Sequence, residues 1–264
     1  MQFNPNQFVT AKVKPLPVYL LLDVSSSMSG DKINNLNEAV NVMIRTMADE
    51  EKMEVEILIS VITFGSEAHV HLPATSATQI EWSNLNASGL TAMGAALTKA
   101  KEMIEDKEIT PSRAYRPTIV LVSDGQPNDT GWEQAMYDFI NNGRSQKCDR
   151  MAMAIGKDAD ENVLKRFIEG TEHELFYASN AVDLHEFFRY VTMSVTHRSR
   201  SQNPNEVPAD AEIEKLKEAA VEMIKRKKTA DSDIISKVPD ESNQAADNSA
   251  ETTKSSDILS DDEW

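Results

Sequence analysis

Apolar runs alternate with amphipathic segments along the first 197 residues of the chain. Short runs rich in Val, Ile and Leu predict strands, and apolar residues at helical spacing predict the helices between them. This alternation is typical of an α/β fold with a doubly wound, mostly parallel sheet and helices on both faces. The predicted sheet has six strands, at residues 18–23, 55–64, 68–72, 118–123, 150–155 and 174–178. The predicted helices span residues 32–47, 92–104, 131–142, 160–169 and 181–195.

The pattern divides the chain into five parts. Residues 1–15 form an N-terminal arm, and residues 16–197 form the folded domain. Residues 198–208 contain two prolines and several small polar residues, which indicates a linker. Residues 209–228 keep apolar positions on one helical face and end in a cluster of Lys and Arg, which predicts an amphipathic helix. Residues 229–264 carry 2 basic and 10 acidic side chains and lack Phe, Tyr and Gly, so we expect a disordered acidic tail.

The charge balance limits the kinds of partner. The chain has 27 Lys and Arg against 43 Asp and Glu, a formal net charge of −16, which argues against a nucleic acid partner. A single cysteine, Cys148, excludes an intramolecular disulfide and a multi-thiolate metal site within one chain. The first residues show no signal-peptide pattern, and no apolar run is long enough to span a membrane. We therefore expect a cytoplasmic protein without a membrane partner.

Polar side chains follow two of the predicted central strands. Asp23, Ser25 and Ser27 stand at alternate positions after the first strand, and Asp124 follows a later one. Thr91 lies between them in sequence, on a loop that precedes a helix. In doubly wound sheets, ligands bind at the carboxyl ends of the strands where the connection order reverses. We therefore expect these five oxygen-bearing side chains to lie together at that edge of the sheet.

The chemistry of the five residues favours a hard cation. Oxygen ligands without His or Cys suit Mg²⁺, Mn²⁺ or Ca²⁺. The small number of carboxylates favours Mg²⁺, which prefers six-fold coordination and keeps some of its waters. Five side chains leave one coordination position open.

Four stretches around these residues form a recognisable set: LDVSSSM at 22–28, SVITF at 60–64, SGLT at 88–91 and LVSDGQP at 121–127. They resemble the von Willebrand factor A (vWA) domain family and its metal-ion-dependent adhesion site (MIDAS). The family pattern is D-x-S-x-S, then a Thr in a second loop and an Asp in a third, and the resemblance covers roughly residues 16–197. Within the family, the chain looks most like the intracellular bacterial TerY-like proteins of tellurium-resistance and stress gene clusters.

The resemblance implies a vWA/Rossmann-like fold and a non-catalytic protein-interaction domain. Carried over by position, it implies that Ser25, Ser27 and Thr91 bind the metal through their hydroxyls, whereas Asp23 and Asp124 hold metal-bound waters. An Asp or Glu of a partner protein then fills the open position. A Ser/Thr kinase or phosphatase encoded nearby is one such partner, in a tellurite-type stress or defence pathway.

Three residues near the site are candidates for contact with that partner. Ser26 stands where the family often has Gly, and Leu90 precedes Thr91 where this subfamily often has Gly. Neither change removes a ligand, but Ser26 would restrict the loop and Leu90 would add an apolar contact at the rim. Trp132 is the candidate aromatic contact, with packing in the core as an equal alternative.

Two other functions stay open. A metal-dependent hydrolase or phosphatase with Ser25 as nucleophile needs a nearby base, and no His lies in an expected site loop. Because the chain also lacks the P-loop, dinucleotide-binding and serine-hydrolase motifs, we expect no catalysis. An accessory subunit of an AAA⁺ ATPase is the second alternative, as other intracellular members of the family are.

Overall fold

A computed structural model of the chain describes residues 14–50, 55–124, 126–157, 159–207 and 215. Residues 14 and 15, predicted as the end of an N-terminal arm, belong to the first strand because they pair with Val55 and Glu56 of the next one. The predicted tail at 229–264, the rest of the arm, and the predicted helix at 209–228 apart from Lys215 lie outside the described residues.

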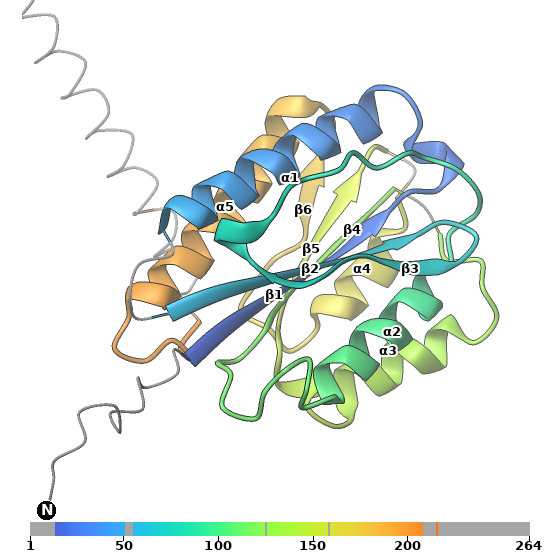
Figure 1. Cartoon of the computed structure of the whole chain (residues 1–264). Helices are drawn as coiled ribbons and strands as arrows, with labels where there is room; N and C mark the ends of the chain where they lie inside the picture. Colours follow the sequence, from blue (N-terminus) through green and yellow to red (C-terminus); the bar gives the residue numbers. More distant parts are fainter. Residues whose placement is uncertain (1–13, 51–54, 125, 158, 208–214, 216–264) are drawn as a thin grey trace, which may run out of the picture. The chain divides into compact units, whose positions relative to one another are not determined.

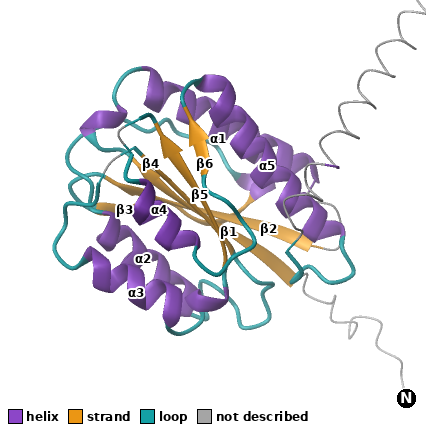
Figure 2. Ribbon diagram, turned by 180° about the vertical axis from the view of Figure 1, so that it is seen from behind, coloured by secondary structure: helices purple, strands orange, loops and turns teal. Residues whose placement is uncertain are grey.

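The described residues form six strands, which make one sheet in the order β3-β2-β1-β4-β5-β6 (Figures 1 and 2). Neighbouring strands are parallel except β2 and β3, which form an antiparallel pair at one edge. The predicted doubly wound, mostly parallel sheet is therefore confirmed. The edge strand continues past its predicted end at residue 72. The strands are β1 (Lys14–Asp23), β2 (Val55–Phe64), β3 (Ala68–Ser76), β4 (Thr118–Ser123), β5 (Asp149–Ile155) and β6 (Phe176–Ala178).

The described residues also form five α-helices, which cover both faces of the sheet. Helices α1 and α5 lie side by side on one face, whereas α2, α3 and α4 cover the other (Figures 1 and 2). Among these described helices, none combines the length and the apolar character that crossing a membrane requires. The helices are α1 (Asp31–Glu50), α2 (Met93–Glu105), α3 (Trp132–Asn141), α4 (Glu161–Ile168) and α5 (Ala181–Arg200).

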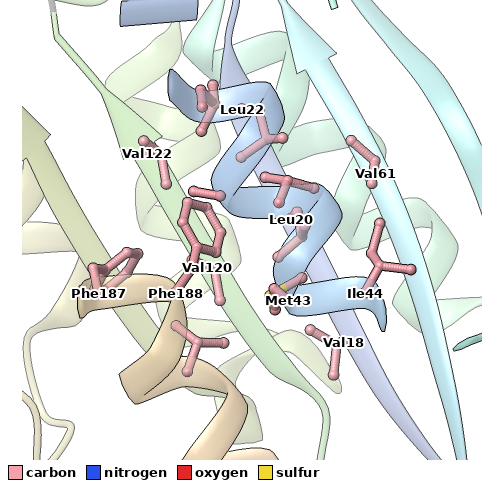
Figure 3. Packing of buried hydrophobic residues seen from close by; sticks show 14 of the residues in the cluster. Val18, Leu20, Leu22, Met43, Ile44, Val61, Val120, Val122, Phe187 and Phe188 are labelled. Atoms are coloured by element: carbon pink, nitrogen blue, oxygen red, sulfur yellow. The ribbon is translucent and has the colours of Figure 1, made fainter. Parts of the chain in front are cut away.

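Strand β1 separates two hydrophobic clusters, one on each face of the sheet. Val18, Leu20 and Leu22 belong to the cluster under α1 and α5, whereas Tyr19 and Leu21 belong to the cluster on the opposite face. Figure 3 shows the first set packed against side chains of both helices and of β2 and β4. Burial on both faces explains why this strand is apolar along its length. It also fixes in place the polar residues that follow the strand.

Helix α5 ends later than predicted, and the linker predicted from residue 198 therefore starts too early. The helix runs to Arg200, and the Arg198 side chain is fully buried. The Arg198 guanidinium donates hydrogen bonds to the Pro204 carbonyl (2.8 Å) and to the Thr118 hydroxyl (2.6 Å) at the start of β4. These bonds fasten the last turn of α5 to the sheet, so residues 198–200 belong to the folded domain.

Candidate metal centre

The strand order places two carboxylates at one edge of the sheet. The chain passes from β1 to β2 on one side and later returns to β4 on the other side, so the connections reverse between β1 and β4. Asp23 is the last residue of β1, and Asp124 directly follows β4. Because Leu22 pairs with Val122 across the two parallel strands, Asp23 comes opposite Ser123, and Asp124 follows one residue later at the same edge of the sheet. This is the position at which open α/β sheets bind ligands.

Asp23 is held from two sides. Its Oδ1 accepts a hydrogen bond from the Ser25 backbone N–H (2.8 Å), and its Oδ2 accepts one from the Ser123 hydroxyl (2.6 Å). Burial raises the pKa of the Asp23 carboxyl above its usual value and the Asp124 carboxylate adds to the rise, whereas the bonds from Ser123 and Ser25 oppose it. A cation beside Asp23 would therefore relieve the cost of burying its charge.

Two hydroxyls connect this loop to the second carboxylate. The Ser25 and Ser27 hydroxyl oxygens lie 2.9 Å apart, and the Ser27 hydroxyl donates to Asp124 Oδ1 over 2.7 Å. Ser25 is buried whereas Ser27 is exposed, so the cluster opens to solvent on the Ser27 side. The structure thus brings together four of the five predicted site residues.

The fifth residue, Thr91, is buried in the neighbouring loop, which hydrogen bonds tie to the other two loops. Asn128 bonds the Thr91 backbone twice: its Oδ1 accepts from the Thr91 N–H and its own N–H donates to the Thr91 carbonyl, both at 3.1 Å. The backbone N–H and the hydroxyl of Ser26 both donate to the Gly89 carbonyl at 3.0 Å. Gly89 has φ +82°, and a Cβ there would lie 2.8 Å from the Ser66 backbone nitrogen, so a larger residue would be strained and would push the neighbouring backbone away.

Asp129 fixes the third loop against the start of α2. Its carboxylate accepts hydrogen bonds from the backbone N–H groups of Gly94 (3.2 Å) and Ala95 (2.8 Å), which cap the helix. Sequence reasoning missed both Asn128 and Asp129. The available signal was their place in a short polar stretch after Asp124, since Asn and Asp are the residues that commonly bond backbone groups in loops.

Lys32, on the first turn of α1, was also missed by sequence reasoning. Its ammonium forms an ion pair with Asp124 Oδ2, the oxygen that Ser27 does not use. The Asp124 side chain is fully buried, whereas 38% of the Lys32 side chain is exposed. A cation at the start of the helix that leaves the D-x-S-x-S loop was the signal that could have identified it.

A protein-family model, the von Willebrand factor type A domain, matches residues 18–189, which is more than half of the chain. The chain belongs to the von Willebrand factor type A domain family. Domains of this family are commonly metal-dependent protein-interaction modules, and they are generally not catalytic. The family part of the predicted resemblance is therefore confirmed.

Solved structures share the fold of this vWA domain. A von Willebrand factor type A protein from Catenulispora acidiphila is 20% identical, with a TM-score of 0.55 over 69% of this chain and 42% of the other. The ArnB paralog VWA2 from Sulfolobus acidocaldarius is 18% identical, with a TM-score of 0.52 over 69% and 45% of the two chains. Proximal thread matrix protein 1 from the mussel byssus, solved with a zinc-occupied MIDAS motif, is 14% identical, with a TM-score of 0.54 over 68% and 48%.

A longer curated protein matches by sequence. The voltage-dependent calcium channel subunit alpha-2/delta-3 of Rattus norvegicus is 24% identical over 135 residues, or 46% of this chain. The match spans 12% of the length of that subunit. The match supports a shared domain and gives no information about the rest of the larger protein.

The donor set of the vWA site fits a divalent cation bound through oxygen. In the part of the chain that the structure describes, no three His, Cys, Asp or Glu side chains come together as a metal cluster. The two carboxylates instead alternate with hydroxyls, and the buried Asp23 carboxylate provides the charge that a hard cation needs.

The three predicted rim residues lie in different surroundings. Ser26 and Leu90 are exposed, with 61% of Leu90 accessible to solvent. Trp132 is the first residue of α3 and is half-buried, where it packs against the hydrophobic cluster on the α2 and α3 face. The packing contact is thus observed for Trp132, and contact of these three residues with a partner stays a prediction.

Proposed function

We propose that the chain is a non-catalytic domain that binds Mg²⁺ and recognises a carboxylate of a partner protein. Asp23, Ser25, Ser27, Thr91 and Asp124 would hold the cation. The observation that carries the proposal is the run of hydrogen bonds from Asp23, through the Ser25 N–H and the Ser25 and Ser27 hydroxyls, to Asp124. This cluster is buried at Asp23 and open to solvent at Ser27.

The residues of the site have separate tasks in this proposal. The Ser25 and Ser27 hydroxyls, already 2.9 Å apart, would present oxygen atoms to the cation. Ser123 and the Ser25 N–H keep the Asp23 carboxylate in one orientation, so that its charge faces the same point. A bound Mg²⁺ supplies a centre of positive charge that attracts an oxygen of the partner's Asp or Glu.

The charge of the domain explains why a metal is needed for this recognition. Residues 1–197 carry 17 basic and 27 acidic side chains. An acidic surface repels an acidic partner group, and the site itself holds two buried carboxylates behind the exposed Ser27. A divalent cation between the carboxylates of the domain and that of the partner converts the repulsion into attraction, so binding of the partner should require the cation.

The test uses the full chain as bait with cell extract, in Mg²⁺ and in chelator, followed by mass spectrometry. Asp23→Asn and Asp124→Asn keep the side-chain volume but remove the charge, so both should abolish Mg²⁺-dependent capture and the Mg²⁺ binding heat seen by calorimetry. Glu102→Ala, at an exposed position of α2, is the matched control and should behave as wild type. Equal capture of the same partners in chelator would refute the proposal.

The biological setting is a further part of the proposal and rests on the four sequence stretches alone. Their likeness to TerY-like proteins supports a cytoplasmic role in a tellurite-type stress or defence pathway, with a kinase or phosphatase encoded nearby as partner. The genes adjacent to this one provide the test. Neighbours that encode an AAA⁺ ATPase, and neither a kinase nor a phosphatase, would favour the accessory-subunit alternative.

A further inference from the structure

Both oxygens of the Asp124 carboxylate are already bonded within the chain. Oδ1 accepts the Ser27 hydroxyl, and Oδ2 is paired with the Lys32 ammonium. Lys32 thus places a positive charge on the carboxylate that the metal site shares. A divalent cation that binds through Asp124 must either displace this ammonium or remain close to it, and like charges at that separation repel.

The surroundings of Lys32 allow its ammonium to move away. A cavity of about 360 Å³ lies beside the site at the ends of β5 and β6, and its lining includes Lys32, Asp31 and Asn35 of α1. Gly156 also lines this cavity, and even a Cβ built there would stay 3.6 Å from the Lys32 nitrogen, so the lysine is not crowded on that side. The Lys32 side chain is partly exposed whereas the Asp124 side chain is fully buried. The Lys32 ammonium is therefore the member of the ion pair that can move away.

We propose that Lys32 is an internal competitor of the metal, which lowers the affinity of the site for Mg²⁺ and is displaced toward the adjoining cavity when the metal binds. This inference rests on the proposed metal site and adds its regulation. The Lys32 ammonium neutralises the Asp124 carboxylate until a divalent cation replaces it. The domain would therefore bind Mg²⁺ tightly only when the partner carboxylate also contributes to the binding free energy.

The test is calorimetric titration of the full chain with MgCl₂. Lys32→Met removes the charge and should tighten the Mg²⁺ dissociation constant roughly tenfold, which equals about 1.4 kcal/mol. Lys32→Gln is a second neutral variant, whose amide can still donate to Asp124, and it should tighten binding in the same direction. Lys32→Arg keeps the charge and should stay within about twofold of wild type.

A second lysine at the same edge controls for general electrostatics. Lys157 is exposed and lines the neighbouring hollow, so Lys157→Met removes one positive charge close by without touching the Asp124 pair. It should change the dissociation constant by less than about twofold. If Lys157→Met tightens binding as much as Lys32→Met, the effect is that of net charge and the proposal is wrong.

Thermal unfolding provides a readout that does not depend on a partner. In chelator, Lys32→Met should lower the unfolding midpoint because the buried Asp124 charge loses its counter-ion. Addition of Mg²⁺ should then raise the midpoint by more in Lys32→Met than in wild type. An equal rise in both proteins would overturn the proposal.

The failures of the two proposals are distinguishable. If wild type binds Mg²⁺ and Asp124→Asn does not, the metal site stands; unchanged affinity in both neutral Lys32 variants then overturns the competitor role alone. If folded wild type and both neutral variants show no Mg²⁺ binding, the proposed function fails and the competitor role fails with it.

Discussion

Gly94, the second residue of α2, is the position where the fold and the metal site can be perturbed together. A Cβ built at Gly94 would lie 2.6 Å from the Trp132 Cα, 2.8 Å from an Asp129 carboxylate oxygen and 2.9 Å from the Trp132 Cβ. Two of these atoms belong to the first residue of α3 and cannot rotate away as the end of a flexible side chain would. Gly94→Ala must therefore shift either α3 or the loop that carries Asp129.

The sign of the effect follows from two opposing magnitudes. Alanine is favoured over glycine within a helix by up to about 1 kcal/mol. Against this, forcing an extra carbon into a packed contact costs about 1–3 kcal/mol, and loss of the Asp129 bonds to the N–H groups of Gly94 and Ala95 adds roughly 1–3 kcal/mol more. The variant should be destabilised by about 1–5 kcal/mol, since the two costs together exceed the propensity gain throughout their ranges. Because Asp129 and Asp124 share one loop, Mg²⁺ affinity should fall as well.

The assay is urea unfolding in chelator, combined with Mg²⁺ titration of the same samples. Ala95→Gly is the matched control: this neighbouring residue is exposed, and the change should cost at most about 1 kcal/mol while Mg²⁺ affinity stays the same. If Gly94→Ala is instead more stable than wild type and binds Mg²⁺ equally well, the close contact between α2 and α3 does not constrain the site.

Two further predictions concern buried groups away from the metal site. Burial raises the pKa of the Cys148 thiol from 9.0 to about 12, so at pH 9 roughly one thiol in a thousand is ionised in the folded chain, against about half in the unfolded one. Iodoacetamide should then label Cys148 only as fast as the chain unfolds, and rapid labelling of the native chain would contradict this. The free energy of unfolding should also fall from pH 9 toward pH 12 in wild type, and it should fall less in Cys148→Ala. Arg198→Met should lower the free energy of unfolding by about 3–5 kcal/mol in urea, because it leaves buried acceptors and Asp149 without their cation. Arg200→Met, which removes a surface ion pair with Glu50, is the control and should lower the free energy of unfolding by less than about 1 kcal/mol. A similar decrease in Arg198→Met and Arg200→Met would contradict the role of Arg198 burial.

The strands were predictable because each is a local pattern. β2 and β4 have the predicted limits, since their apolar runs are bounded by Gly65, by Pro117 and by the Asp124 turn. Asp23, Ser25, Ser27 and Asp124 lie together for a related reason: they directly follow β1 and β4, which are neighbouring parallel strands, and their role in binding a metal stays a prediction. Local patterning thus specifies both the sheet and the polar residues at its edge.

The end of α5 was not predictable because its cause is not local. His197, Arg198 and Arg200 resemble the start of a polar linker when they are considered alone. The partner that keeps Arg198 inside is Thr118, 80 residues earlier in the chain, and a polar sequence gives no sign of a contact at that distance. Lys32 and Asn128 each carried a local signal, but the partner of each lies in another loop, so the sequence did not indicate which residue either would contact.

The two carboxylates of the site are balanced in different ways, and this difference determines how the site can work. Among the described residues, Asp23 accepts from the neutral donors Ser25 and Ser123, and burial raises its pKa, so its negative charge is the less well compensated of the two. Asp124 has a full positive charge from Lys32. A cation entering at Ser27 therefore meets one carboxylate that needs it and one that already has a counter-ion. If the proposed function is right, a partner carboxylate at the open position would supply the further negative group that stable binding needs, and metal and partner should each strengthen the binding of the other.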